Sequence, residues 1–403
     1  MKKCSTLWAC AAALAILAAG CVKENKAGEE EEVTVPSDAV NLNAAGETAN
    51  SYIVAPDKTA VFTAQYKGNS KTEETGAVVS AELLWQDAES LIKELYYVPE
   101  TMQVVVKTGK ASGNALVAVR DAGDNILWSW HLWVSDYDPA ASLWSSPATA
   151  NGTVWKFMDR NLGATSAEPS DWNSKGLLYQ WGRKDPFKSP ASFTVQNEDY
   201  SYSANGEPSV YTMANKAITV TPYEVAEGFG SYEKSIQNPT VFYKVMEEYL
   251  GDGDKANHPA SKDWRDTSDD DAWGGVSLTK SINDPCPPGY KVPVLAANGD
   301  HPYSWHDFSK AEWDTVNYGM TQDGQWWPAA GTRVNYSGGL DYPEINPYGG
   351  MWVGTAGKAS ADLEQYPTLY GRYTFIIKTK RMYNKYDQKD ARSQALSVRC
   401  VAE

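Results

Sequence analysis

The chain has 403 residues, of which 12% are aromatic, and its formal net charge is −15. This length and aromatic content argue against disorder over most of the chain and favour β structure packed through aromatic side chains. The negative charge disfavours nucleic acid and anionic lipid surfaces as partners attracted through a long-range field.

The first 20 residues have the pattern of an export signal. Lys2 and Lys3 precede an uncharged apolar run at residues 7–19, which is too short to span a membrane, and LAAGC follows at residues 17–21. LAAGC resembles the bacterial lipobox, which implies cleavage before Cys21 and attachment of acyl chains such as palmitate to that cysteine. An ordinary secretory signal, cleaved near Ala19, is the alternative.

Residues 21–45 form the next predicted segment, a flexible acidic tether. Four consecutive glutamates at residues 29–32 precede a stretch of Pro, Ser, Asn and Ala, and aromatic residues are few. Acidic residues just after a lipobox also resemble the surface-export signals of Bacteroidetes lipoproteins. We therefore expect a lipid-anchored outer-membrane protein that is exposed at the cell surface, with the lipid as its only contact with the membrane. A solvated spacer explains the acidic residues equally well.

Residues 46–138 predict an all-β domain. Strand-sized runs at residues 59–66, 104–106 and 115–119 are separated by clusters of Gly, Asn and Asp. The clearest strand covers residues 126–134, where alternate residues from Ile126 form an apolar core face and Ser129 and His131 belong to a wetter face. Residues 121–125 predict a hairpin loop. The size favours an immunoglobulin-like sandwich, and residues 113–136 resemble modules of fimbrillin-like lipoproteins.

Residues 145–403 predict a second domain after a break at residues 138–142. Short strands are expected between glycine turns, with a closing strand at residues 395–400. Two helices are expected as well. One covers residues 240–250, which place apolar side chains on one helical face, and the other begins at a capping box formed by Ser309 and Glu312.

Five ordered motifs in this second segment carry a family resemblance. They are WKFMDRNLGA at 155–164, YQWGRKDPF at 179–187, DPCPPGYKVP at 284–293, WPAAGTR at 327–333 and SVRCV at 397–401. Together they resemble the Fibrobacter succinogenes major paralogous domain of surface lipoproteins. The sequence departs from the expected pattern near Trp352. The capping box and the final motif also resemble C-type-lectin-like and sulfatase-modifying folds. The resemblance implies an α+β lectin-like domain and supplies no catalytic residues.

Cys286 and Cys400 are the two cysteines that remain if Cys21 is lipidated and residues 1–20 are removed. In an exported protein we expect them to form a disulfide, which closes a loop of 114 residues and contributes about 4–5 kcal/mol in the chain-entropy model. Two buried free thiols are the alternative.

No motif predicts catalysis or a cofactor. Residues 266–271 are rich in aspartate but lack the alternating oxygens and the glycine of a calcium loop, so a solvated loop is preferred and cation binding stays open. His301 and His306 lack zinc spacing, and no Gly-x-Ser-x-Gly elbow is present. The candidate ligand contacts are loop tryptophans expected to be exposed, with aromatic core as the alternative for each: Trp305, Trp326, Trp327 and Trp352.

The sequence therefore predicts a multidomain, β-rich, non-enzymatic surface lipoprotein that acts as an adhesin for a glycan or a surface protein. A fimbrial tip or anchor component, with fimbrial subunits as partners, is the first alternative. No arginine precedes Arg120 after the signal, which disfavours a proteolytically processed stalk subunit. A glycan-active enzyme is the second alternative, because the approach of two carboxylates is set by the fold and not by a motif.

Overall fold

The computed structural model describes residues 33–195, 202–205, 208–218, 225–227, 230–245, 262–307, 310–335, 337–340, 348–357, 370–377 and 387–403. Thr34–Glu403 form one compact unit, and Met1–Val33 form a separate one. Cys21 and the expected signal peptide lie outside the described residues, as does the tether up to residue 32.

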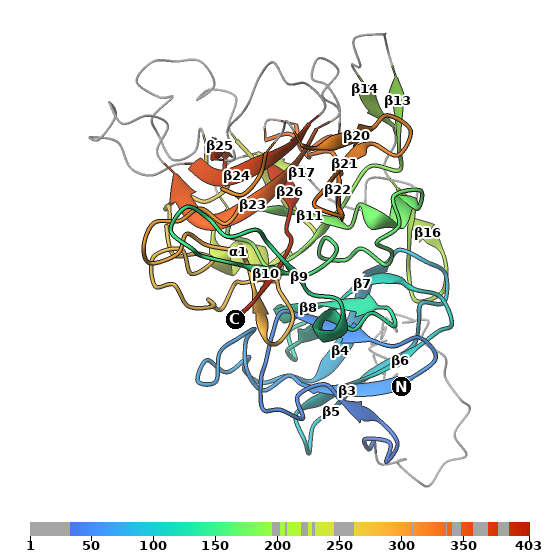
Figure 1. The fold of residues 1–403 in the computed structure, drawn as a ribbon. Coiled ribbons are helices and arrows are strands. Elements are labelled where there is room, and N and C mark those ends of the chain that lie inside the picture. Colours follow the sequence, from blue (N-terminus) through green and yellow to red (C-terminus); the bar gives the residue numbers. More distant parts are fainter. Residues whose placement is uncertain are drawn as a thin grey trace, which may run out of the picture. The chain divides into compact units, whose positions relative to one another are not determined.

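Two sheets organise the first hundred residues of the compact unit (Figure 1, blue to cyan). One has the order β1-β3-β6-β5, namely Val40–Asn41, Thr59–Thr63, Gln103–Thr108 and Ile92–Val98. The other has the order β16-β15-β4-β7-β8-β2, namely Ala217–Ile218, Val210–Tyr211, Ser80–Gln86, Gly113–Arg120, Ile126–Val134 and Ser51–Val54. Side chains of both sheets, such as Phe62, Val104 and Trp130, share one buried apolar cluster. The predicted strands and the hairpin loop at residues 121–125 are confirmed.

Strand β8 differs from its prediction on one face. The alternation that begins at Ile126 is buried as expected. Ser129, His131 and Trp133 point to the opposite face, which the sequence suggested would be wetter, yet each is at most 1% exposed. The prediction of a wet face was wrong because segments that follow residue 150 in the chain cover it. Lys184 and Asp185, for example, bond to Ser129.

The rest of the unit is also β-rich. A six-stranded sheet has the order β12-β11-β26-β23-β24-β25, namely Phe187–Lys188, Leu177–Gln180, Ala395–Ser397, Tyr348–Gly357, Tyr370–Ile377 and Gln388–Ala391. A four-stranded sheet has the order β19-β27-β10-β9, namely Tyr290–Lys291, Val401–Ala402, Lys156–Phe157 and Trp144–Ser145. Smaller sheets are β20-β21-β22 (Glu312–Asp314, Gly319–Gln322, Gln325–Pro328), β13-β14 (Ser192–Val195, Tyr202–Asn205) and β17-β18 (Val225–Glu227, Phe242–Lys244).

The two predicted helices are wrong wherever the structure describes them. Phe242–Lys244 form strand β18, which pairs in parallel with β17. Glu312–Asp314 form strand β20, which pairs with β21. At both places the residues pair with another strand. This pairing overrides the helical pattern of the local sequence. The rest of the first predicted helix (residues 246–250) and Ser309 lie outside the described residues.

Helical structure is sparse in the described parts of the chain. The single α-helix found there is α1, Tyr232–Gln237, which Ser231 caps by accepting a hydrogen bond from the backbone N–H of Lys234. Two 3₁₀ turns, η1 (Pro139–Ala141) and η2 (Trp172–Ser174), begin in the same way at aspartates. Turn η2 supplies a side chain of the site described below.

One hydrophobic cluster joins early and late segments of the chain. It contains Trp85, Leu116 and Trp133 together with Met158 and Trp181. Strand β15 also extends the sheet of β4, through the pair Tyr211 and Gln86. A domain boundary at residues 138–145 remains a prediction. The hydrophobic cluster described above contains residues from both sides of it.

Candidate functional site

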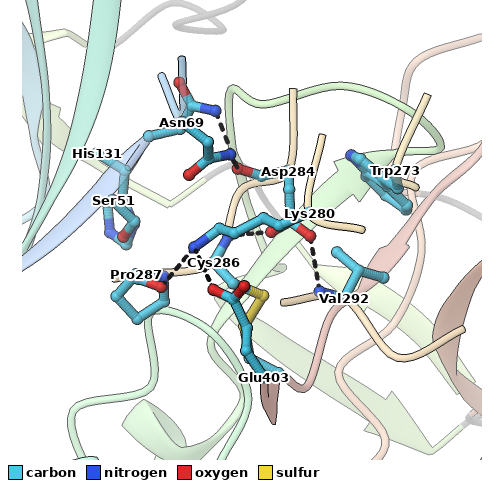
Figure 2. The surroundings of a disulfide bond; sticks show 12 residues. Ser51, Asn69, His131, Trp273, Lys280, Asp284, Cys286, Pro287, Val292 and Glu403 are labelled. Carbon is cyan, nitrogen blue, oxygen red and sulfur yellow. Dashed lines mark hydrogen bonds and ion pairs between the residues drawn. A yellow bond between two sulfur atoms is a disulfide. The ribbon is translucent and has the colours of Figure 1, made fainter. Parts of the chain in front are cut away.

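The disulfide lies within a network of hydrogen bonds (Figure 2). The sulfur atoms of Cys286 and Cys400 are 2.02 Å apart, and both residues are fully buried. The Asp284 carboxylate accepts hydrogen bonds from the backbone N–H groups of Cys286 and Val292, each at 2.8 Å. Burial raises the pKa of Asp284 to about 6. The proline-rich motif at residues 284–293 is therefore held by its own aspartate as well as by the disulfide.

The same network of hydrogen bonds extends to the first two sheets. The Asn50 side chain donates to the carbonyl oxygens of Ile282 and Asp284, at 2.7 and 2.9 Å, and accepts from the Trp128 indole at 3.0 Å. Lys280 donates to the Pro287 carbonyl at 2.7 Å. These bonds are internal, so the disulfide region stabilises the fold.

The four tryptophans predicted as exposed contacts are buried. Trp305 is 8% exposed, Trp326 6%, Trp327 1% and Trp352 0%. Three of the indole N–H groups have protein acceptors: that of Trp305 donates to Pro302, that of Trp326 to Ser174 and that of Trp352 to Tyr179. The expectation that these rings stand exposed on loops was wrong, and they belong to the core.

Trp326 and Trp327 are both buried because β22 is covered on both of its faces. The Trp326 ring packs so close to Gly319 that a Cβ there would lie 2.4 Å from it. The Arg399 guanidinium lies 3.9 Å from the centroid of the Trp327 ring, whose other neighbours include Phe157. Pro328 does place β22 at the edge of its sheet, but an edge strand can still be buried by loops.

The described residues enclose a polar cleft of about 450 Å³, within the usual size range of small-molecule sites. It lies where the ends of β4, β7 and β12 meet the loop that carries η2. Its lining comprises Asp87, Ala88, Ser112, Gly113, Asn114, Gly163, Thr165, Trp172, Asn173, Gly176, Lys188, Ser189, Pro190, Ala191, Pro208 and Ser209. We call this hollow the junction cleft.

An ion pair lies in the wall of the junction cleft. The Lys188 ammonium is 2.7 Å from Oδ2 of Asp87, and both side chains are largely buried. The Asp87 carboxylate also accepts from the backbone N–H of Asn114, at 2.6 Å, and from its side-chain amide, at 2.9 Å. Charge-assisted bonds of this kind hold their geometry well. The carboxylate is therefore fixed in the wall.

His131 supports this wall from behind. The Asn114 amide donates through Nδ2 to Asp87 and, at 3.0 Å, to the Gly163 carbonyl, so its oxygen must accept from Nε2 of His131, at 2.9 Å. Nδ1 of His131 then accepts from the Ser51 hydroxyl at 2.8 Å. Burial lowers the pKa of His131 to about 3, which keeps the imidazole neutral in this chain of hydrogen bonds.

Trp172 also lines the cleft. Its indole N–H donates to the Pro190 carbonyl at 3.0 Å, and its ring is only partly buried. The Lys175 ammonium lies 5.2 Å from the ring centroid and is held by the carbonyl oxygens of Asn317 and Tyr318. These contacts orient a ring that remains part of the cleft surface.

The acidic loop and the histidine pair have structural roles. The Asp270 carboxylate pairs with Arg392, and the Asp271 carboxylate accepts from the backbone N–H groups of Val276 and Ser277. His301 and His306 are buried, which lowers the pKa of each to about 4. In the described part of the chain, no group of three or more His, Cys, Asp or Glu residues is placed to hold a metal ion.

Comparison of the chain with family models, with curated proteins and with solved structures finds no match. Within the described residues, no helix is both long and apolar enough to cross a membrane.

The junction cleft was not predicted from the sequence. Asp87 and Lys188 are 101 residues apart, and neither belongs to a motif with a known spacing. Asn114 and Trp172 stand next to a glycine and a polar turn, which are common in loops. A usable signal existed at Lys188, which directly follows the motif at 179–187, but the position of Asp87 beside it depends on the fold.

Proposed function

We propose that this protein is a lipid-anchored lipoprotein on the surface of an outer membrane, where it acts as an adhesin that binds an extracellular ligand without chemical turnover. The N-terminal pair of sheets with its shared core supports an immunoglobulin-like sandwich at residues 46–138. The five motifs support a lectin-like major paralogous domain at residues 145–403. The LAAGC motif at residues 17–21 supports the lipid anchor.

The observation that carries the binding role is the junction cleft. It is polar and lined by the partly buried ring of Trp172, and its wall is held by bonds that exist without any ligand. Preorganised sites of this kind lose little side-chain entropy on binding. Hydrolysis of a glycan by the usual route requires two carboxylates, and the described lining of the cleft contributes one, which is paired with Lys188. This supports binding over turnover.

The anchor is tested by fractionation of cells that express the full chain. Cys21→Ala should move the protein from the membrane fraction to a soluble one, and mass spectrometry of the wild type should find lipid on Cys21. A Cys21→Ala protein that stays in the membrane fraction, with no lipid on residue 21 of the wild type, would contradict the anchor.

The binding site is tested with soluble protein that begins after Cys21, applied to a printed glycan array and to a panel of extracellular matrix proteins. Ser112→Trp fills the cleft from an exposed position and should abolish binding to the hits. Val276→Trp adds the same ring at a position that is 68% exposed and outside the cleft lining, and it should bind like the wild type. Equal binding by both variants would place the site elsewhere. Cleaved product after incubation with a hit would favour the enzyme.

A further inference from the structure

We infer that the junction cleft takes a neutral saccharide, with one sugar face stacked on Trp172 and hydroxyl groups bonded to the Asp87–Lys188 pair. This inference rests on the proposed binding function and adds the chemical class of the ligand. It follows from three features of the cleft: its charge, its hydrogen-bonding groups and its aromatic wall.

The charge of the cleft excludes most ionised ligands. Asp87 and Lys188 are the only charged side chains in the described lining, and they neutralise each other at 2.7 Å. A carboxylate or sulfate on the ligand would need a cation of its own, or it would have to take Lys188 from Asp87 and leave that carboxylate unpaired. Either outcome is costly in a largely buried wall. The chain's overall charge of −15 also repels anionic polymers before contact.

The hydrogen-bonding groups of the cleft suit hydroxyl groups. A sugar hydroxyl both donates and accepts, so adjacent hydroxyls can donate to the Asp87 carboxylate and accept from the Lys188 ammonium at the same time. Hydroxyl side chains at Ser112, Thr165 and Ser209 line the same hollow. An apolar peptide would leave these groups without partners, which disfavours it.

The aromatic wall suits the apolar face of a sugar ring. The face of an indole carries negative potential, and the C–H bonds on one side of a pyranose carry a weak positive one, so the two attract each other and exclude water. Because the Trp172 N–H is already bonded to Pro190, the indole contributes its face and edge rather than its donor. The ring and the ion pair therefore offer one ligand an apolar contact and a polar contact.

The experiment uses soluble protein that begins after Cys21 and an array that carries neutral, sialylated and sulfated oligosaccharides. The wild type should bind neutral members. Trp172→Ala should weaken that binding by at least about tenfold, the usual effect of removing an aromatic anchor, and Trp172→Phe should recover part of it. Thermal melting of each variant checks the fold, which should survive because Trp172 is only partly buried.

Asp87→Asn supplies a second test, in which the charge of the cleft is changed and the preferred ligand should change with it. It keeps the size of the side chain but removes the negative charge of Asp87, so the charge of the cleft becomes more positive by one unit. Binding of neutral saccharides should weaken, and binding of sialylated or sulfated ones should appear or strengthen.

The outcomes separate the inference from the function on which it rests. Wild-type binding to acidic saccharides alone, or to matrix proteins alone, that Ser112→Trp abolishes would overturn the neutral-saccharide inference and leave the binding function intact. Binding to neutral saccharides that neither Ser112→Trp nor Trp172→Ala weakens would overturn both the site and the inference. Loss with Trp172→Ala in a folded protein, together with the charge switch in Asp87→Asn, is the supporting result.

Discussion

The two faces of β8 are buried to the same extent but by different chemistry. On one face Trp128, Trp130 and Leu132 pack among apolar side chains of the first two sheets. On the other, Ser129 bonds to Asp185, which a later segment brings in. His131 bonds to Asn114 and Ser51 on the neighbouring strands β7 and β2. The first face depends on non-directional burial, which tolerates adjustment, whereas the second depends on hydrogen bonds that must all be made.

The comparison shows why a polar residue on a strand is a poor sign of solvent. Ser129 donates to the Asp185 carboxylate at 2.7 Å, and Lys184 donates to Ser129 and to Asp185 in turn. Burial lowers the pKa of Lys184, as expected for an ammonium removed from water. The polar face of β8 therefore serves as an interface within the chain, and the junction cleft opens at its rim.

The largest effect is expected on the apolar face. Trp130→Ala removes a large ring that is 1% exposed and should lower the free energy of unfolding by about 3–5 kcal/mol. Trp130→Phe should cost less, because most of the apolar contact remains. Urea unfolding followed by circular dichroism measures both. A loss below about 1 kcal/mol for Trp130→Ala would show that this face is not closely packed.

A smaller loss is expected when the buried ion pair on the polar face is broken. Asp185→Ala removes the carboxylate partner of the Lys184 ammonium, which keeps Ser129 and the Trp128 ring, and should cost about 3 kcal/mol. Replacing both partners, as Lys184→Met with Asp185→Leu, should restore much of that loss, since no buried charge then remains. If the double variant is less stable than Asp185→Ala, the pair itself stabilises the protein.

The smallest effect is a change in pH dependence. The folded-state pKa of His131, about 3, is below its unfolded value of about 6.5, so the unfolded chain binds the extra proton between these values and stability falls as pH falls through that window. His131→Gln should flatten this decline by up to about 1.4 kcal/mol per pH unit.

Urea midpoints between pH 7.5 and pH 4.5 measure the decline in wild type and variant. Asp284 and Asp390, whose pKa values burial raises to about 6, act in the opposite direction, and the substitution leaves them unchanged. Parallel curves for the two proteins would show that the His131 imidazole becomes protonated in the folded state.

The sequence predicted those parts of the fold that short-range patterns determine. The bounds of β8 and the loop at residues 121–125 follow from alternation and turn residues within about fifteen positions. Strand β20 was missed because Ser309 and Glu312 also fit the start of a helix, although its hairpin partner β21 is close in sequence. Strand β18 was missed because no local pattern gives its parallel pairing with β17. For the same reason Trp352 could not be recognised as core: its indole bonds to the Tyr179 carbonyl, 173 residues away.

The candidate site was less predictable than the fold. Aromatic residues in glycine-rich segments suggested exposed contacts, but Trp326 and Trp327 are buried, and Trp327 packs against Phe157 of β10. Trp172 gave no distinguishing signal, and its exposure depends on how η2 lies beside β12. A cleft assembled from three distant segments is a property of packing, so its residues become visible only when the strands are placed together.

Strands β26 and β27 and Cys400 also constrain the order in which the protein can mature. Strand β27 inserts between β10 and β19, β26 inserts between β11 and β23, and Cys400 closes the disulfide. A chain that emerges amino end first, from a ribosome or from an export channel, lacks all three of these elements until residues 395–402 have emerged. Until then, β10 and β11 each have an unpaired edge. A chaperone would have to protect those edges during synthesis or transport.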